Sequence, residues 1–515
     1  MPRPFAGEEF SFTEPDGAEI RLRGWGNQFE AVFETPDGYT VVEDPATGYQ
    51  HYATLSEDGT DLVATEARPG EQDPRSLGLT PHLRRPAETA KQAARDAYSD
   101  GGVPPRWVER RALAQARRAA EGEAAPELAP ATGDCLGLCV LVEFPDVPGT
   151  ISRGEVDDFC NKPGYTGFGN NGSVSDYFRS VSDGRLRYRN TVTAYYRTQH
   201  PRAYYTDPSV PFGTRAQQLI HEALNSLAAG GFDFSALTAD SAGNILALNV
   251  FYAGNRVNQW SKGLWPHQWT LQTTFPAGPG RRFADYQITD IGDELTLGTF
   301  CHENGHMVCD FPDLYDYGNE GNGIGHYCLM CFGGPDKNPT QVGAYLKNVA
   351  GWASALSNAT PGTSVALKAG RNEFLVHRRN PTEYFIVENR ARAGHDAGLP
   401  DEGVAIWHVD ELGNNSNEQM TPALHYECSL EQADNRFDLE NRVNGGDTGD
   451  LYAGPGAEFG TATAPGSRWW DGSSSGFEVT VTSPVGASMT VTVNGQTDPS
   501  IRAAEQASPQ DVSIG

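Results

Sequence analysis

The spacing of hydrophobic and polar residues changes several times along the chain, and each change marks a predicted element. In the first 80 residues apolar and polar positions alternate between turn signals such as Asp37-Gly38, a period that is typical of β-strands. Residues 19–24 and 30–42 predict strands, the second of them a hairpin. Residues 1–80 are therefore predicted to form a small N-terminal β module.

The next stretch, residues 81–133, is rich in Ala, Arg, Glu and Gln and poor in aromatic residues. This composition favours a helical segment followed by a linker. The Ala- and Pro-rich run at 123–133 is typical of a flexible linker, and exposed linkers are common sites of proteolytic activation.

Residues 134–355 combine buried-strand and helix patterns. The continuous apolar run at 136–144 predicts a buried strand, and Ser173 is placed as the N-cap of a helix that ends before Gly184. A second helix is expected at 214–228 and a second buried strand at 244–253. The pattern predicts an α/β (α+β) domain.

Strand spacing returns in residues 356–495, which predict a C-terminal β domain. The last segment, 496–515, lacks aromatic residues and is predicted to be a disordered tail. The expected strands of the β domain are 364–369, 383–390, 403–410, 477–482 and 488–493.

The strongest chemical signal is the H-E-x-x-H pattern of residues 302–306. On a helix, His302 and His306 lie on one face about one turn apart, so both imidazoles can reach one Zn²⁺. Glu303 can then accept a proton from water at the metal. An apolar lead-in and Pro312 predict that this helix covers residues 296–309. Two solvated histidines on an exposed helix are the alternative that the bare pattern leaves open.

Two histidines leave zinc short of a third protein ligand. Asp310 shares their helical face but lies roughly 12 Å along the axis from His302, which is too far. A carboxylate beyond the break at Pro312 can fold back. We expect Asp313 to be this ligand, with Asp316 and Asp310 as alternatives; a turn carboxylate that caps its own backbone is the structural alternative.

These motifs together resemble a known family. H-E-x-G-H, then P-D-L-Y-D, then a methionine in G-x-x-x-Y-x-L-M-x-x-G-G is similar to the immune inhibitor A-type family of metzincin-like zinc metallopeptidases. The resemblance implies that Asp313 is the third ligand and that Met330 forms the turn beneath the zinc ligands, rather than being an ordinary core methionine. Two positions depart from the metzincin pattern, because Cys309 replaces a glycine and Asp313 falls one residue late.

The resemblance extends from the β module to about Val493 and implies an architecture and an activity. It implies a zincin-like catalytic domain with a zinc helix, between a β module similar to the family's pro-region and a C-terminal β-sandwich-like domain. The implied function is that of a zinc-dependent endopeptidase, made as a zymogen, which cleaves proteins or peptides. The alternatives are a degenerate peptidase that acts as a binding or scaffold protein, and another zinc hydrolase such as a deamidase. The β module contains no cysteine, so none of its own thiols can block the zinc. If the module inhibits the peptidase, it would do so through a carboxylate or by occluding the site; a stability or docking role is equally compatible.

Charge and composition restrict the partners. The 515 residues carry a formal net charge of −28, which argues against binding of nucleic acid or anionic membranes. No apolar run approaches the ~18 residues of a membrane helix, and residues 1–8 lack the apolar core of a secretory leader. Because the family is mostly secreted, the resemblance nevertheless predicts an extracellular protein, while a cytoplasmic location stays open. The sequence leaves the oligomeric state undetermined.

Eight cysteines all follow residue 134, and four of them, Cys301, Cys309, Cys328 and Cys331, flank the H-E-x-x-H motif. An even, clustered set can form disulfides in an oxidising compartment, tying the zinc helix to the methionine segment. A Cys₄ zinc site and free buried thiols are the alternatives.

Three further features are weaker candidates. Asp240 to Asn244 has the outline of a calcium loop, compatible with a Ca²⁺ site, but it offers few acidic oxygens. His267 follows a W-P motif and is a cleft candidate, although a packed or exposed histidine is the simpler interpretation. His408 lies in an alternating strand pattern and is expected to be structural.

Overall fold

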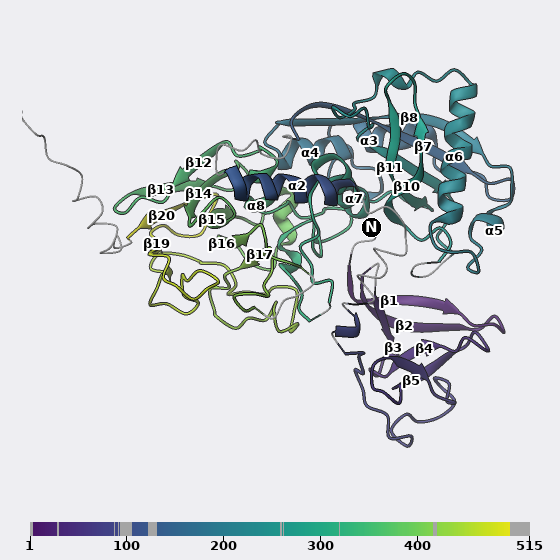
Figure 1. Cartoon of the computed structure of the whole chain (residues 1–515), viewed down its shortest axis with the longest axis horizontal. Helices are drawn as coiled ribbons and strands as arrows, with labels where there is room; N and C mark the ends of the chain where they lie inside the picture. Colours follow the sequence, from purple (N-terminus) through teal and green to yellow (C-terminus); the bar gives the residue numbers. More distant parts are fainter. Residues whose placement is uncertain are drawn as a thin grey trace, which may run out of the picture.

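A computed structural model describes residues 4–27, 30–86, 88–90, 92, 106–121, 131–257, 260, 262–318, 320–415 and 420–494. Within these residues the chain forms a mixed α/β structure with sheets of six, five, five and four strands (Figure 1). The predicted mixed class and the N-terminal β module are confirmed. The predicted tail at 496–515 and most of the linker at 123–133 lie outside the described residues.

The N-terminal module is an antiparallel sheet whose strands pair in chain order. In β2 the buried Leu22 lies between the exposed Arg21 and Arg23, so the period-2 pattern places one face on a core. That core is small, with Leu22, Tyr39, Val41, Tyr52 and Ala67 as its buried members. The strands are β1 (Phe5–Thr13), β2 (Glu19–Gly26), β3 (Ala31–Glu34), β4 (Thr40–Glu43), β5 (Gln50–Leu55) and β6 (Leu62–Ala64).

The central sheet has the strand order β10-β11-β9-β7-β8. All neighbours are parallel except the edge strand β10, which is antiparallel to β11. Successive residues of β7 enter different cores, Leu141 one and Val142 the other, because both faces of the sheet are covered. The strands are β7 (Gly133–Glu143), β8 (Leu186–Arg197), β9 (Leu248–Ala253), β10 (His267–Pro276) and β11 (Arg282–Ile291).

Helices cover both faces of this sheet. On one face lie α3 (Arg153–Asn161), α4 (Val174–Val181) and α7 (Leu297–Cys309), and on the other lies α6 (Thr214–Ala229). Ser173 caps α4 as predicted, in a capping box with Asp176. A buried sheet with α7 packed on it is the platform for the candidate site.

The C-terminal part has two sheets that share one core. The buried side chains of Phe385 and Val387 from the first sheet pack with Val479 and Val491 from the second. The first sheet is β12 (Ala355–Asn358), β14 (Glu373–Arg378), β15 (Glu383–Arg390), β16 (Gly403–Asp410) and β17 (Cys428–Leu430). The second is β13 (Ser364–Lys368), β20 (Ser488–Val493), β19 (Val479–Val481) and β18 (Glu458–Phe459).

One helix from the predicted linker region joins these parts. Helix α2 (Arg106–Glu121), dark blue in Figure 1, runs beside α7 and α8 (Ala344–Val349). Its side chains reach the central part through Arg106, which pairs with Asp240 at 2.8 Å, and the C-terminal part through Arg118, which pairs with Glu411 at 3.0 Å. The helix therefore bridges two parts of the fold.

Candidate metal centre

Helix α7 positions the H-E-x-x-H motif. It begins after Thr296 and ends at Cys309, as the sequence predicts. Asp310 takes a left-handed conformation with φ of 55°, and its N–H donates to carbonyls of the last turn, so the chain reverses before Pro312. This reversal returns the following residues toward the two histidines.

The reversal brings three candidate ligands together. Oδ1 of Asp313 lies 3.1 Å from Nε2 of His302 and 3.2 Å from Nε2 of His306, and the two Nε2 atoms are 3.3 Å apart. All three side chains are fully buried, and the group can hold one metal ion. Glu303, between the histidines on α7, is also buried.

Backbone carbonyls fix the two imidazoles. Nδ1 of His302 lies 3.0 Å from the carbonyl oxygen of Leu329, and Nδ1 of His306 lies 2.6 Å from that of Phe311. Because carbonyls only accept, each Nδ1 carries a proton, and each Nε2 is the ring nitrogen that faces the other candidate ligands. This is the arrangement of metal-binding histidines.

The carboxylate of Asp313 is held in a similar way. The hydroxyl of Tyr317 donates to its Oδ2 at 2.9 Å, and the amide of Asn415 donates to its backbone carbonyl at 2.7 Å. Burial by itself would raise the pKa of Asp313, but the positive charge that the imidazoles of His306 and His302 carry when they are protonated holds that pKa well below its usual range. The group is therefore an anionic ligand in this setting.

Met330 lies directly against α7. A Cβ atom added to Gly305 would be 2.7 Å from Sδ of Met330, so a larger residue at this position would displace the methionine side chain. The carbonyl of Met330 accepts from the N–H of Leu314 at 2.7 Å, and the preceding residue, Leu329, orients His302. The methionine segment thus supports both the helix and the third ligand; its assignment as a Met-turn stays a prediction.

The two alternative carboxylates have other partners. Nε of Arg110 donates to both carboxylate oxygens of Asp310 at 3.0 Å. Asp316 accepts from the N–H groups of Gly318 at 2.6 Å and Gly321 at 2.5 Å, which close its own loop. Asp313 is therefore the carboxylate that the fold directs at the histidines.

Helix α2 covers this centre. The ring of Trp107 stacks on that of His306 at 4.9 Å between centroids and 18° between planes. Trp107 is buried, and the neighbouring Arg110 and Arg111 form ion pairs with Asp310 and Glu427. Sequence reasoning missed Trp107, since nothing in the local pattern of α2 signals a partner about 200 positions away.

The predicted disulfides are absent. All eight cysteines are buried free thiols, so the expected bridges among Cys301, Cys309, Cys328 and Cys331 are wrong for this structure. Sγ of Cys331 instead donates to the carbonyl of Asn322 at 3.3 Å.

A Cys₄ zinc site is excluded for the described cysteines, because no three of them converge. The proposed calcium loop is also wrong. Oδ1 of Asp240 accepts from the backbone and side chain of Asn244 at 2.8 and 3.0 Å, and its Oδ2 pairs with Arg106. These contacts occupy the only carboxylate of the loop.

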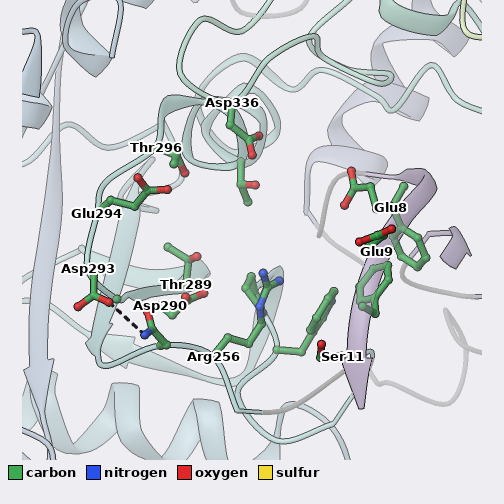
Figure 2. Close-up of a pocket in the computed structure, with 17 residues that line it drawn as sticks. Glu8, Glu9, Ser11, Arg256, Thr289, Asp290, Asp293, Glu294, Thr296 and Asp336 are labelled. Carbon is green, nitrogen blue, oxygen red and sulfur yellow. Dashed lines mark hydrogen bonds between the residues drawn. The ribbon is translucent and has the colours of Figure 1, made fainter. Parts of the chain in front are cut away.

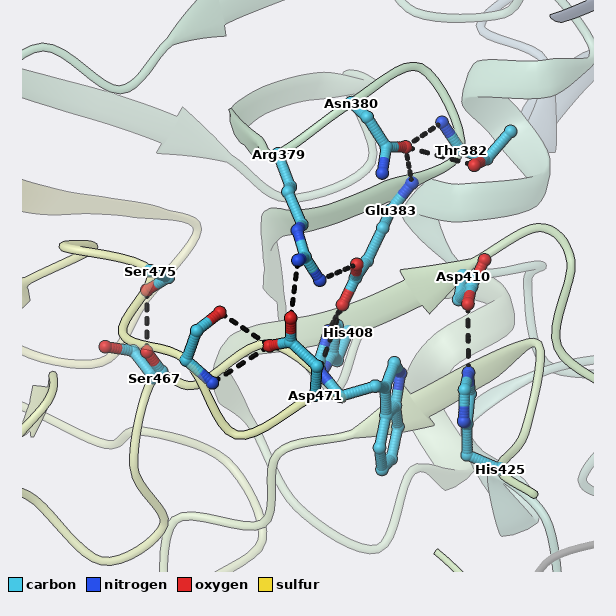
Figure 3. A network of polar contacts seen from close by, with 12 residues as sticks. Arg379, Asn380, Thr382, Glu383, His408, Asp410, His425, Ser467, Asp471 and Ser475 are labelled. Atoms are coloured by element: carbon cyan, nitrogen blue, oxygen red, sulfur yellow. Dashed lines mark hydrogen bonds and ion pairs between the residues drawn. The ribbon is translucent and has the colours of Figure 1, made fainter. Parts of the chain in front are cut away.

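Both further histidines are structural. His267 is buried, its ring nitrogens lie 2.6 Å from the carbonyl of Trp265 and 2.9 Å from the hydroxyl of Tyr286, and burial lowers its pKa to about 3. His408 lies between carboxylates of the C-terminal part, 3.5 Å from Glu383, and stacks on Trp470 (Figure 3).

A separate cavity of about 520 Å³ lies between β1 and the region where β11 leads into α7 (Figure 2). Glu8 and Glu9 face it from β1, and Asp293 and Glu294 face it from the opposite side, with Arg256 between them. None of the three candidate ligands lines this cavity. It is therefore distinct from the metal centre.

No protein-family model matches the chain, and no curated protein sequence matches it. The family resemblance therefore stays a prediction from the sequence. No helix within the described part of the chain is both long and apolar enough to span a membrane.

Proposed function

We propose that the protein is a zinc-dependent endopeptidase. The observation that carries the proposal is the triangle of two Nε2 atoms and one Oδ1 atom, with sides of 3.1, 3.2 and 3.3 Å. Tetrahedral ligands at about 2.0–2.1 Å from zinc lie about 3.3–3.4 Å apart, so the spacing fits. A set of two imidazoles and one carboxylate is also a donor set that zinc prefers in catalytic sites.

The residues of the centre have separate roles in this proposal. His302, His306 and Asp313 would hold the ion, which would supply the Lewis acidity that activates water and polarises the scissile carbonyl. Glu303 takes the proton of the attacking water and transfers it to the leaving amine. The carbonyls of Leu329 and Phe311 keep both imidazoles in the correct tautomer.

Peptides are the proposed substrates because the motifs around Met330 resemble the immune inhibitor A-type peptidases. A degenerate scaffold protein is less well supported, since that alternative expects Asp313 to lie away from the imidazoles, and it lies 3.1 and 3.2 Å from them. A zincin-like catalytic domain and a β-sandwich-like C-terminal domain belong to the same proposal.

The chain is further proposed to be a latent form. Support comes from Trp107, whose ring covers His306, and from the ion pairs that hold α2 over the centre. The β module would then anchor the segment, while α2 excludes substrate. Cleavage between 122 and 130 would free α2 from the catalytic part.

The test uses the full chain with a specific protease site placed in residues 122–130. Zinc content and casein hydrolysis are measured before and after the cut for the parent, for Glu303→Gln and for Glu458→Gln, an exposed control on β18. We expect all three to hold one zinc ion and Glu303→Gln to lose about 10²–10⁴-fold in rate. A cut parent that binds no zinc, or a Glu303→Gln variant as active as the control, contradicts the proposal.

A further inference from the structure

A second cluster of carboxylates lies outside the metal centre. One carboxylate oxygen from each of Asp434, Asp447 and Asp450 lies within 4.8 Å of the other two. All three belong to the loop that connects β17 to β18. Three like charges at this separation repel one another unless a cation lies among them.

Two buried oxygens of the cluster lack partners among the described residues. Asp450 is 1% exposed; its Oδ2 accepts from the hydroxyl of Tyr327 at 2.9 Å and from the N–H of Asp447 at 2.8 Å, whereas its Oδ1 receives no hydrogen bond. Oδ1 of Asp447 is buried and unpartnered as well. Native proteins rarely bury charged oxygens without a partner, so these atoms point to a ligand.

The cation that the described loop itself provides is insufficient. The guanidinium of Arg436 lies 3.5 Å from Oδ2 of Asp434 and 3.9 Å from Oδ2 of Asp447. Its side chain is 63% exposed, and no contact joins it to Asp450. One solvated positive charge therefore contacts only two of the three carboxylates.

We infer that Asp434, Asp447 and Asp450 bind a hard divalent cation of the Ca²⁺ class. The donors are carboxylate oxygens without imidazole or thiolate, a set that selects Ca²⁺ over zinc. Three carboxylates provide up to six oxygens, and water completes a coordination shell of six to eight.

This cation would brace the candidate metal centre. The loop packs against the segment that follows α7, because the N–H of Asn322 donates to the carbonyl of Leu439 and that of His326 to the carbonyl of Gly445, both at 2.8 Å. Tyr327, whose hydroxyl contacts Asp450, lies two residues before Leu329, which orients His302. Loss of the cation is therefore expected to loosen the support of His302.

The test measures cation binding directly, with zinc already bound and without any activity assay. Ca²⁺ is titrated calorimetrically into the full chain, and Tb³⁺ luminescence excited through tyrosine reports proximity to Tyr327. The variants are Asp450→Asn and Asp434→Asn, and Glu458→Gln is the charge-matched control. Thermal unfolding without added cation verifies that each variant folds. Asp434 accepts fewer hydrogen bonds than Asp450, so cation binding can still be measured with Asp434→Asn if Asp450→Asn unfolds.

We expect one Ca²⁺ per parent chain, binding at least about tenfold weaker in either asparagine variant, and an unchanged control. Tb³⁺ emission should decrease in the same two variants. No binding by the parent at about 1 mM Ca²⁺, or equal binding by the parent and a folded asparagine variant, overturns the inference.

Discussion

Replacement of Trp107 by alanine tests whether α2 keeps the chain latent. The indole is 4% exposed and stacks on His306, one of the candidate zinc ligands. The substitution removes this cover but leaves the ion pairs of Arg110 and Arg111 with Asp310 and Glu427. It should therefore weaken the docking of α2 without changing any residue of the metal centre.

The expected magnitude follows from burial. Truncation of a buried tryptophan to alanine costs about 3–5 kcal/mol. If α2 docks as one unit, this loss shifts the ratio of docked to undocked helix by roughly 100- to 4,000-fold, at about 1.4 kcal/mol for each factor of ten. Uncut Trp107→Ala should thus gain activity by up to this factor, limited by the rate of the cut enzyme.

The assay compares peptide hydrolysis by uncut and cut protein and, independently, the rate at which a chelator removes zinc. The matched control is Leu113→Ala, because Leu113 lies on the same helix but is 55% exposed. Leucine and alanine have similar helix propensities, so the control should retain the latency of the parent.

The occlusion mechanism is refuted if uncut Trp107→Ala stays as inactive as the parent, loses zinc no faster, and yet becomes fully active after the cut. Equal activation by Leu113→Ala would instead show that any weakening of α2 opens the site. Only selective activation by Trp107→Ala agrees with the stacking on His306.

Three other outcomes are expected. Asp313→Asn should weaken zinc binding by more than about 100-fold in a chelator competition, because loss of a residue that only hydrogen-bonds to a metal ligand already costs about 10- to 100-fold in affinity. Asp310→Asn should leave zinc binding unchanged. Burial raises the pKa of Glu440 to about 7, above its unfolded value, so the stabilisation from its bound proton is full below pH ~4.5 and is lost as the pH rises through 7. Between pH 5 and 8 the free energy of unfolding should therefore decrease by roughly 2 kcal/mol less in Glu440→Gln than in the parent. Identical pH profiles for the two proteins would contradict this prediction. Thiol titration should find eight reactive cysteines in denatured, unreduced protein and almost none in the native protein, and fewer than eight after denaturation would reveal bridges.

Local patterns in the sequence were sufficient for the elements that carry the site. The apolar lead-in and Pro312 predicted α7 to within a residue, because helix periodicity and proline act over a few positions. The four-residue spacing of His302 and His306 likewise places both imidazoles on one face. Asp313 was favoured over Asp310 by helix geometry alone, since a residue that continues the helix cannot reach its first turn.

Tertiary contacts decided everything that joins distant segments. Trp107 covers His306, Tyr317 and Asn415 hold Asp313, and α2 pairs with acids of two different parts of the fold. The spacing of the cysteines suggested disulfides, but all eight cysteines are buried as free thiols. Such pairings depend on the path of the whole chain, and a local pattern contains no information about that path.

The carboxylate clusters show the same division. Asp240 looked like a calcium ligand from its loop, yet Arg106 from α2 neutralises it. Asp434, Asp447 and Asp450 had no recognisable motif, and the loop folds them together against Tyr327. The sequence determines which oxygens are available. Only the fold determines whether a cationic side chain or other carboxylates lie beside them, because charges interact through space over a few ångströms, whatever their separation along the chain.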